Sequence, residues 1–326
     1  MDSSWYFLRY CDPKNDKKPF DESKVKYWMP VDQYIGGIEH AVGHLIYSRF
    51  FTKVLRDMKI LPGNLDEPFI RLFNQGIVHK NGVRMSKSAG NAVTQEEISE
   101  KYGIDAARLF LMFVASPESG IEWTDTGIEG VFRFVKRVLS LKTNSKADEK
   151  SEHYRNKFIK EFSDDIENFK FNLAIIKLIK FSEVLSEKCD KQSYEDFLKT
   201  ISVFAPHIAE ELWHKIGNKT FISLEKWPAA DEKKINGKFE EAEKNADNTV
   251  SDILNVLSII RQKTGKEGAK IYLYVIPNEL ASYNAEAISK RIGKETKIFA
   301  VNDKKKYDPE GKAGKAKPGK PGIYIE

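Results

Sequence analysis

The chain has 326 residues, 41% hydrophobic and 31% charged, a composition ordinary for a soluble protein of two or three domains. No apolar run reaches the roughly 18 residues that a membrane span requires, and no signal peptide opens the chain, so we expect a cytoplasmic protein without a membrane partner. The two cysteines, Cys11 and Cys189, offer neither a disulfide framework nor a zinc knuckle. The net charge of +5 is compatible with a polyanionic partner.

Short β-like and helical stretches alternate in residues 1 to about 75, as expected for part of an α/β layer. A strand is predicted from Met29 to Gly37 and a helix from Ile38 to Phe51. Two glycines at this junction let backbone approach a ligand closely, and the helix N-terminus favours anionic groups. The plain alternative is a tight turn whose helix-start glutamate stabilises the helix dipole.

His40 and His44 lie four residues apart, so they are predicted to share one face of that helix. Together with Glu39 they suggest zinc. The order is Glu-His-x-x-x-His, however, and no third ligand is apparent in the sequence, so we predict no metal site. Satisfied core histidines are a further alternative.

The next segment, Asn81 to Asn91, is a polar loop that contains the run Arg84-Met85-Ser86-Lys87-Ser88. It lies between an apolar strand-like segment and a helix. It is dense in hydrogen-bond donors and carries an ammonium group that can reach phosphate oxygens. Taken alone, the run is equally compatible with a solvated basic turn.

Two helices are predicted directly after the loop. Thr94 and Glu97 form a capping box, and the first helix ends at Gly103. Asp105 is expected to cap the second helix, Ala106 to Ala115, which is apolar nearly all round and therefore expected to be buried.

From Gly127 to about Gly217, apolar residues recur with the helical period and polar stretches separate the repeats, which predicts an antiparallel helix bundle. Basic residues on its outer faces are either phosphate contacts or an ordinary solvated surface. The candidates are Arg133, Lys136, Arg137, Lys177 and Lys180.

The rest of the chain predicts a small α/β domain after a charged stretch from Asp231 to Asn248. The segment Asp303–Pro321 holds seven lysines and three acids and is expected to be a flexible basic loop. A final strand, Ile323 to Ile325, is expected to pair back onto the sheet. The other predicted elements are a helix from Val250 to Gln262, a strand from Ile271 to Ile276, a helix from about Glu279 to Arg291 and a strand from Lys297 to Val301.

The run Arg84–Ser88 resembles the KMSKS signature of class I aminoacyl-tRNA synthetases, with arginine in place of the first lysine. Together with the segments Asp2–Tyr10 and Met29–Phe51, it resembles the C-terminal half of the leucyl-type active site. The likeness is strongest from Asp2 to about Leu141, continues at Phe171–Ala174 and Phe204–Trp213, and weakens after Trp227.

The resemblance implies an α/β plus all-α fold in three domains. Residues 1–120 would be the C-terminal part of a Rossmann-like catalytic domain with the KMSKS-type loop. Residues 121–230 would form the antiparallel, anticodon-stem-binding helix bundle, and residues 231–326 a small α/β tRNA-binding module with a basic loop.

The family's roles carry over to matching positions. Lys87 is expected to be catalytic, holding the ATP phosphates and stabilising charge as pyrophosphate leaves; Mg²⁺ is expected with ATP. The implied ATP-binding set is Arg84, Met85, Ser86, Lys87, Ser88, Gly36, Gly37 and Glu39. Ser3, Tyr6, His40 and His44 are the implied leucine pocket, and Arg133, Lys136 and Arg137 the implied tRNA contacts.

No His-x-Gly-His motif occurs in the sequence, and the family's editing domain is absent. We therefore expect a C-terminal fragment or subunit of a leucine–tRNA ligase, inactive without the half that carries the missing motif. Its implied partners are tRNA-Leu, leucine, ATP and that half. The alternatives are a non-catalytic tRNA- or RNA-binding module derived from such an enzyme and, less compatible with the block Tyr34–Ala41, a methionyl or valyl synthetase.

Overall fold

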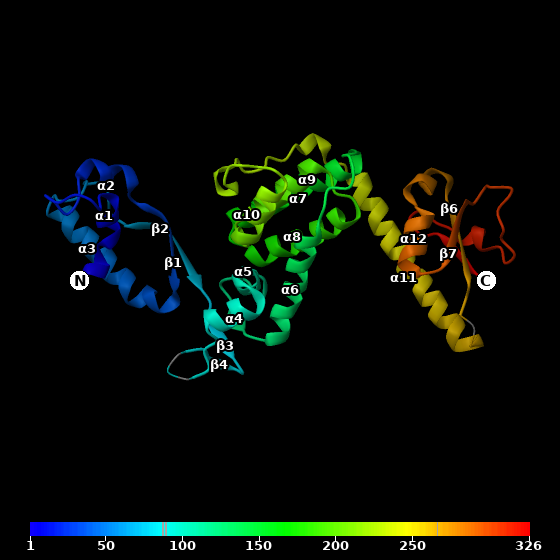
Figure 1. The fold of residues 1–326 in the computed structure, drawn as a ribbon, viewed down its shortest axis with the longest axis horizontal. Helices are drawn as coiled ribbons and strands as arrows, with labels where there is room; N and C mark the ends of the chain where they lie inside the picture. The colour runs from blue at the N-terminus through cyan, green and yellow to red at the C-terminus, as the bar shows by residue number, and fades with distance from the viewer. Residues whose placement is uncertain (87, 89, 266) are drawn as a thin grey trace. The chain divides into compact units, whose positions relative to one another are not determined.

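A computed structural model describes residues 1–86, 88, 90–265 and 267–326, which form two compact units, Met1–Glu232 and Lys233–Glu326 (Figure 1). The first unit combines small sheets with a helix bundle, and the second is a separate α/β domain. The predicted α/β plus all-α fold class is confirmed. Among the described residues, no helix is both long and apolar enough to cross a membrane.

The first part of unit 1 is a parallel two-stranded sheet with helices around it. Strands β1 and β2 pair from Val31 opposite Phe69 to Gly37 opposite Gln75, and β1 confirms the predicted strand. A small apolar core that includes Phe7, Leu8 and Val25 lies beneath. The elements are η1 (Asp2–Ser4), α1 (Tyr6–Cys11), α2 (Glu22–Trp28), β1 (Val31–Gly37), η2 (Ile38–Val42), α3 (His44–Asp57) and β2 (Phe69–Gln75).

A three-stranded sheet with the order β4-β3-β5 follows and carries the polar loop. Its strands are β3 (Val78–Lys80), β4 (Val83–Arg84) and β5 (Ile121–Glu122). Helix α4 (Gln95–Tyr102) begins with the predicted capping box of Thr94 and Glu97, and Gly103, with φ of 82°, ends it as predicted.

Helix α5 (Ile104–Phe113) differs from its prediction at the N-terminus. Its N-cap is Gly103, and Asp105 is not the cap but lies in the first turn, 3% exposed. The carboxylate of Asp105 instead binds residues of a distant helix, a long-range contact that the local sequence pattern does not contain.

The predicted bundle is present, with neighbouring helices packed side by side (Figure 1). Phe162, Ile175 and Leu178 are completely buried at its centre. Residues of α4 and α5 belong to the same apolar core. The elements are α6 (Asp125–Ser140), α7 (Glu149–Glu167), α8 (Phe171–Glu187), α9 (Lys191–Ile201), α10 (Pro206–Lys215) and the short turns η3 (Ile222–Leu224) and η4 (Glu232–Lys234).

Unit 2 is a three-stranded sheet, β7-β6-β8, with helices α11 and α12 against one face. Strand β8 runs antiparallel to β6, so the predicted return of the last strand is confirmed. The elements are α11 (Gly237–Thr264), β6 (Lys270–Val275), η5 (Pro277–Ser282), α12 (Ala285–Ile292), β7 (Glu295–Ala300), η6 (Lys312–Lys315) and β8 (Gly322–Ile325).

Two predictions for unit 2 were wrong in detail. Helix α11 begins at Gly237, not at Val250, because the charged stretch before Val250 is rich in good helix formers and Asn236 caps it. The single helix expected from about Glu279 is divided into η5 and α12, with a new N-cap at Asn284.

The lysine-rich segment Asp303–Pro321 is folded against the sheet, where the sequence predicted a flexible loop. The hydroxyl of Tyr274 donates to the carbonyl of Tyr307. The carboxylate of Asp308 accepts hydrogen bonds from the amides of Lys312 and Ala313 at 2.7 and 3.0 Å. These bonds give a segment of disorder-prone composition a defined path.

Candidate nucleotide and amino-acid site

The ends of β1 and β2 and the start of the polar loop enclose a cavity of about 430 Å³. Five of the eight predicted ATP-binding residues line it, namely Gly37, Glu39, Arg84, Met85 and Ser86. Gly36 lies next to the wall, on β1, and Ser88 lies farther along the loop. Lys87, the predicted catalytic residue, falls outside the described residues.

Two segments that are far apart in sequence meet at this cavity. The guanidinium of Arg84 lies 3.8 Å from the carboxylate of Glu39, and both side chains are more than half exposed. Such an exposed pair contributes little stability. The pair shows that the glycine-rich turn after β1 lies opposite the polar loop.

The polar loop is held at its base by Asn91, a residue that the sequence analysis did not single out as functional. The side-chain oxygen of Asn91 accepts from the Ser86 amide at 2.9 Å, and its side-chain nitrogen donates to the Arg84 carbonyl at 3.2 Å. The amide of Met85 also donates to Val78 at 2.8 Å. A usable signal was present, since asparagine beside glycine is typical of turns.

Gly76 is a second residue that the sequence analysis missed. It lies between β2 and β3 on the cavity wall, and its amide donates to the Pro117 carbonyl at 2.8 Å. A Cβ at this position would lie 1.8 Å from the backbone oxygen of Ser119. Glycine is therefore required here, because the opposing group is backbone and cannot rotate away.

The four predicted leucine-pocket residues gather around His44. Its Nε2 lies 2.6 Å from the Ser3 carbonyl oxygen, and its ring stacks on Tyr6 with the centroids 5.8 Å apart. The ring of His40 stands edge-on to it at 6.1 Å. These contacts join the start of the chain to the residues that follow β1.

Tyr34 on β1 completes this group and was not predicted. Its hydroxyl lies 3.2 Å from Nδ1 of His44. Because the Ser3 carbonyl can only accept, Nε2 carries the proton, and Nδ1 is left to accept from Tyr34. Burial raises the pKa of the Tyr34 hydroxyl, and burial followed by the nearby Tyr10 raises that of Tyr6. Both phenol groups are therefore neutral at ordinary pH.

One geometric prediction about the histidines was wrong. His40 and His44 do not share a face of one helix, because the helix predicted from Ile38 is broken at Gly43. His40 belongs to the turn η2 and His44 is the first residue of α3. The two histidine rings meet because the helix is broken there, and Gly43 is the only sign of this break in the sequence.

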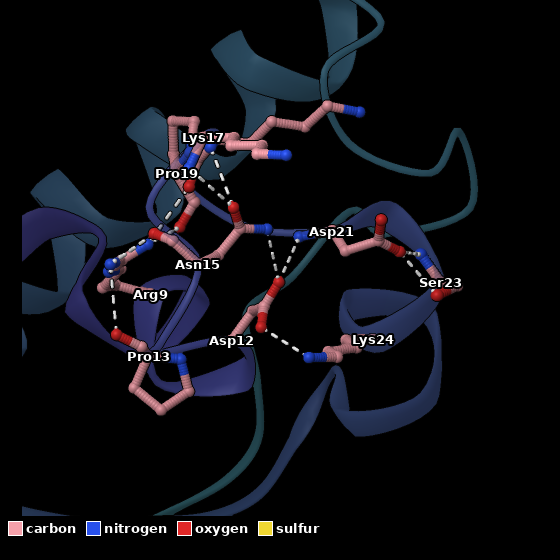
Figure 2. Close-up of polar contacts among 10 residues, drawn as sticks. Arg9, Asp12, Pro13, Asn15, Lys17, Pro19, Asp21, Ser23 and Lys24 are labelled. Atoms are coloured by element: carbon pink, nitrogen blue, oxygen red, sulfur yellow. Dashed lines mark hydrogen bonds and ion pairs between the residues drawn. The ribbon is translucent and has the colours of Figure 1, made fainter.

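Helix α1 carries Tyr6. Side-chain hydrogen bonds hold the segment that connects α1 to α2 in place (Figure 2). Arg9 donates to the backbone carbonyls of Pro13, Asn15, Lys18 and Pro19 at 2.9–3.1 Å. The carboxylate of Asp12 accepts from Lys24 at 2.5 Å and from the Asn15 side chain at 2.7 Å. The bond from Lys24, followed by that from Asn15, lowers the pKa of Asp12. The carboxylate therefore stays ionised, and keeps both bonds, over the ordinary pH range.

The predicted tRNA contacts lie on α6, where Arg133 is exposed. The other two have partners within the bundle. Lys136 lies 4.5 Å from the ring centroid of Phe132, and Arg137 donates to Glu183 at 2.8 Å. A phosphate would have to compete with Glu183 for Arg137. Among the described residues, no group of three or more His, Cys, Asp or Glu side chains is placed to hold a metal ion.

Two families match the chain. The family of class I tRNA synthetases for I, L, M and V matches residues 11–124, and the anticodon-binding domain of tRNA ligase matches residues 148–273. The leucine–tRNA ligase of Thermosipho melanesiensis is 41% identical over 93% of this chain and 39% of its own length. That of Fervidobacterium nodosum is 45% identical over 71% of this chain and 31% of its own length.

A solved structure agrees with these matches. The ternary complex of the Agrobacterium radiobacter K84 LeuRS with tRNA and LeuAMS matches 72% of this chain and 34% of its own, with 34% identity and a TM-score of 0.66. The chain thus spans about two fifths or less of the relatives it matches. It belongs to the class I aminoacyl-tRNA synthetases and carries catalytic-region and anticodon-binding domains of the leucyl-tRNA synthetase branch.

Proposed function

We propose that this chain supplies part of the active site and the tRNA-binding domains of a leucine–tRNA ligase. One observation carries the proposal: the turn after β1 and the base of the KMSKS-type loop line the same cavity. Strand β1, which leads into this turn, also carries Tyr34. A nucleotide in this cavity would lie close to the group of aromatic rings around His44. The two substrates of amino-acid activation would then be neighbours.

In the proposed reaction, a carboxylate oxygen of leucine attacks the α-phosphorus of ATP. A new phosphorus–oxygen bond gives leucyl-adenylate, and the bond from the α-phosphorus to the bridging oxygen breaks to release pyrophosphate. A hydroxyl of the tRNA then attacks the leucyl carbonyl carbon, the ester bond forms, and AMP leaves. Positioning and charge stabilisation supply most of the catalysis in phosphoryl chemistry. We assign Lys87 to the leaving pyrophosphate and Glu39 to the ribose or amine groups. Mg²⁺ would enter with ATP as part of the substrate.

We propose that the site is completed by a further α/β segment, in the same polypeptide or a second subunit. Two features of the first part of the chain support this. Val42, Tyr47 and Phe50 are 80, 66 and 68% exposed, an unusual density of apolar surface for one short segment. The parallel pair β1 and β2 also has no further strand beside it among the described residues, whereas parallel sheets normally have several strands and covered faces. The chain alone is therefore expected not to activate leucine.

We further propose that the bundle and unit 2 bind tRNA-Leu in the cytoplasm, and that phosphate contacts dominate this binding. Arg133 is the strongest single candidate in the bundle, because its side chain is exposed. In unit 2 the candidates are exposed lysines of the folded segment Asp303–Pro321, whose acids Asp303 and Asp308 bind backbone amides of the segment itself.

Filter binding of the purified chain to leucine tRNA and to an unrelated tRNA, at two salt concentrations, tests the tRNA role. We expect salt-sensitive binding that prefers leucine tRNA. Equal binding of both tRNAs would instead favour a non-catalytic RNA-binding module, and absence of binding would contradict the proposed recognition role.

A further inference from the structure

Two charged residues on one turn of α5 hold the connection between α9 and α10. The carboxylate of Asp105 accepts from the Ile208 amide at 2.8 Å and lies 2.8 Å from Nδ1 of His207. The guanidinium of Arg108 donates to the Phe204 carbonyl at 3.0 Å and to the Val203 carbonyl at 3.3 Å. We call these four contacts the α5 clamp.

The clamp matches the polarity of both helix ends that it touches. Asp105 satisfies an amide in the first turn of α10, where the N-terminus of a helix attracts negative charge. Arg108 satisfies carbonyls just after the C-terminus of α9, where positive charge is favoured. Asp105 is 3% exposed, so its contacts are shielded from solvent competition.

The same helix belongs to the apolar core on which residues beside the KMSKS-type loop pack. Met85, in the Arg84–Ser88 run, and Val93, just after the loop, are partly buried against this core, which includes Ala107 and Phe110 of α5. Helix α4, which follows the loop, packs directly on α5. Helix α5 therefore contacts both α4, which follows the loop, and the α9–α10 connection.

We propose that Asp105 and Arg108 are positioning residues that fix the KMSKS-type loop to the helix bundle. The proposal rests on the proposed activation reaction for its catalytic consequence, but its structural consequence is independent of that reaction. With the clamp intact, Met85 and Val93 are held by both the apolar core and two charge-matched helix ends. With the clamp broken, only the apolar contacts remain.

Hydrogen–deuterium exchange on the purified chain tests the structural part. Arg108→Gln removes an exposed side chain and is expected to leave the fold intact; Asp105→Asn removes the buried charge with little change in shape. Both should accelerate amide exchange between Val78 and Tyr102. Asp196→Asn is the matched control, because Asp196 is also a buried bundle carboxylate, 5% exposed and 3.5 Å from Arg155. Equal acceleration by control and clamp variants, or none in the clamp variants, overturns the proposal.

Leucine-dependent ATP–pyrophosphate exchange in the complete enzyme tests the catalytic part. We expect the clamp variants to lower kcat about ten- to a hundredfold, since small displacements of positioning groups have effects of this size. The KM for leucine should stay within about twofold, and Arg108→Lys should recover part of the rate. An unchanged kcat, or a loss matched by Asp196→Asn, refutes the positioning role. A wild-type enzyme without exchange activity would refute the proposed function, while the hydrogen-exchange result would still decide on the clamp.

Discussion

The first part of the chain, residues 1–75, and the helix bundle bury their apolar residues differently. On α3, Tyr47 and Phe50 face solvent, although the helix is clearly amphipathic. In the bundle, Phe162 and Leu178 are completely buried. The comparison indicates that the bundle closes its own core, whereas the first part of the chain leaves large apolar side chains exposed.

Side-chain caps do not separate the two regions. In the bundle, α7 begins with a capping box and α9 with an aspartate cap, but α6, α8 and α10 have no side-chain cap bond. In the first part of the chain, Asp21 caps α2, whereas η2 and α3, with Gly37 and Gly43 as N-caps, have no such bond. Uncapped amides next to a cavity are available to an anionic ligand. In η2 such amides follow Gly37, which lines the cavity.

The largest expected effect tests whether the bundle core is the stable centre of the chain. Phe162→Ala removes a fully buried ring and should lower the free energy of unfolding by about 3–5 kcal/mol. Phe50→Ala, the matched change on α3, should alter it by only about 0.5 kcal/mol. Urea denaturation followed by circular dichroism measures both, and equal losses would break the comparison.

The next effect concerns chemistry instead of stability. Lys87→Ala in the complete enzyme should lower the rate of leucine activation by about 10²–10³-fold, as expected when a group that stabilises developing charge is removed. Leucine binding, measured by calorimetry, should be nearly unchanged. Activation that survives the substitution would show that the loop is a solvated basic turn.

A smaller effect tests the group around His44. Tyr34→Phe removes the hydroxyl that lies 3.2 Å from Nδ1 of His44, so the imidazole loses its partner at that nitrogen. The KM for leucine should rise about fivefold, which corresponds to about 1 kcal/mol. Tyr27→Phe, at a 77% exposed tyrosine, is the control. Equal KM values for the two variants would exclude Tyr34 from the pocket.

The smallest effect is a pH dependence of bundle stability. Hydrogen bonds from Lys188 and Ser151 lower the pKa of Asp148, the N-cap of α7, from 3.8 to about 2. This stabilisation is complete above pH 3.8 and is lost as pH falls through 2. Because Asp148 is half exposed, we expect it to be worth only about 1 kcal/mol. Asp148→Asn should flatten the stability profile between those pH values, and an unchanged profile would contradict this assignment.

Local rules predicted local features well. The capping box at Thr94, the stop at Gly103 and the strand that ends at Gly37 follow from neighbouring residues, and all three are present. The wrong predictions involved partners distant in sequence. The local sequence predicts Asp105 as an N-cap, but in the folded chain its carboxylate binds the first turn of α10. The composition of the lysine-rich segment predicts flexibility, but Tyr274 and Glu279 bind its backbone.

The candidate site shows the same division. The resemblance to known motifs implied five of the ten residues that line the cavity, because each motif lies on one strand–turn segment. It did not predict Gly76, whose role depends on the backbone of Ser119, or Tyr34, whose role depends on the tautomer of His44. Such residues act through contacts that only the folded chain brings together.

The most direct test of the account is leucine-dependent ATP–pyrophosphate exchange by this chain, alone and after it is joined to the part of a relative that it does not match. We predict no exchange by the chain alone and exchange that depends on Lys87 in the completed enzyme. Exchange by the chain alone would contradict the claim that its first part is an open, incomplete half of a site. A completed enzyme that exchanged no pyrophosphate would contradict the proposed function.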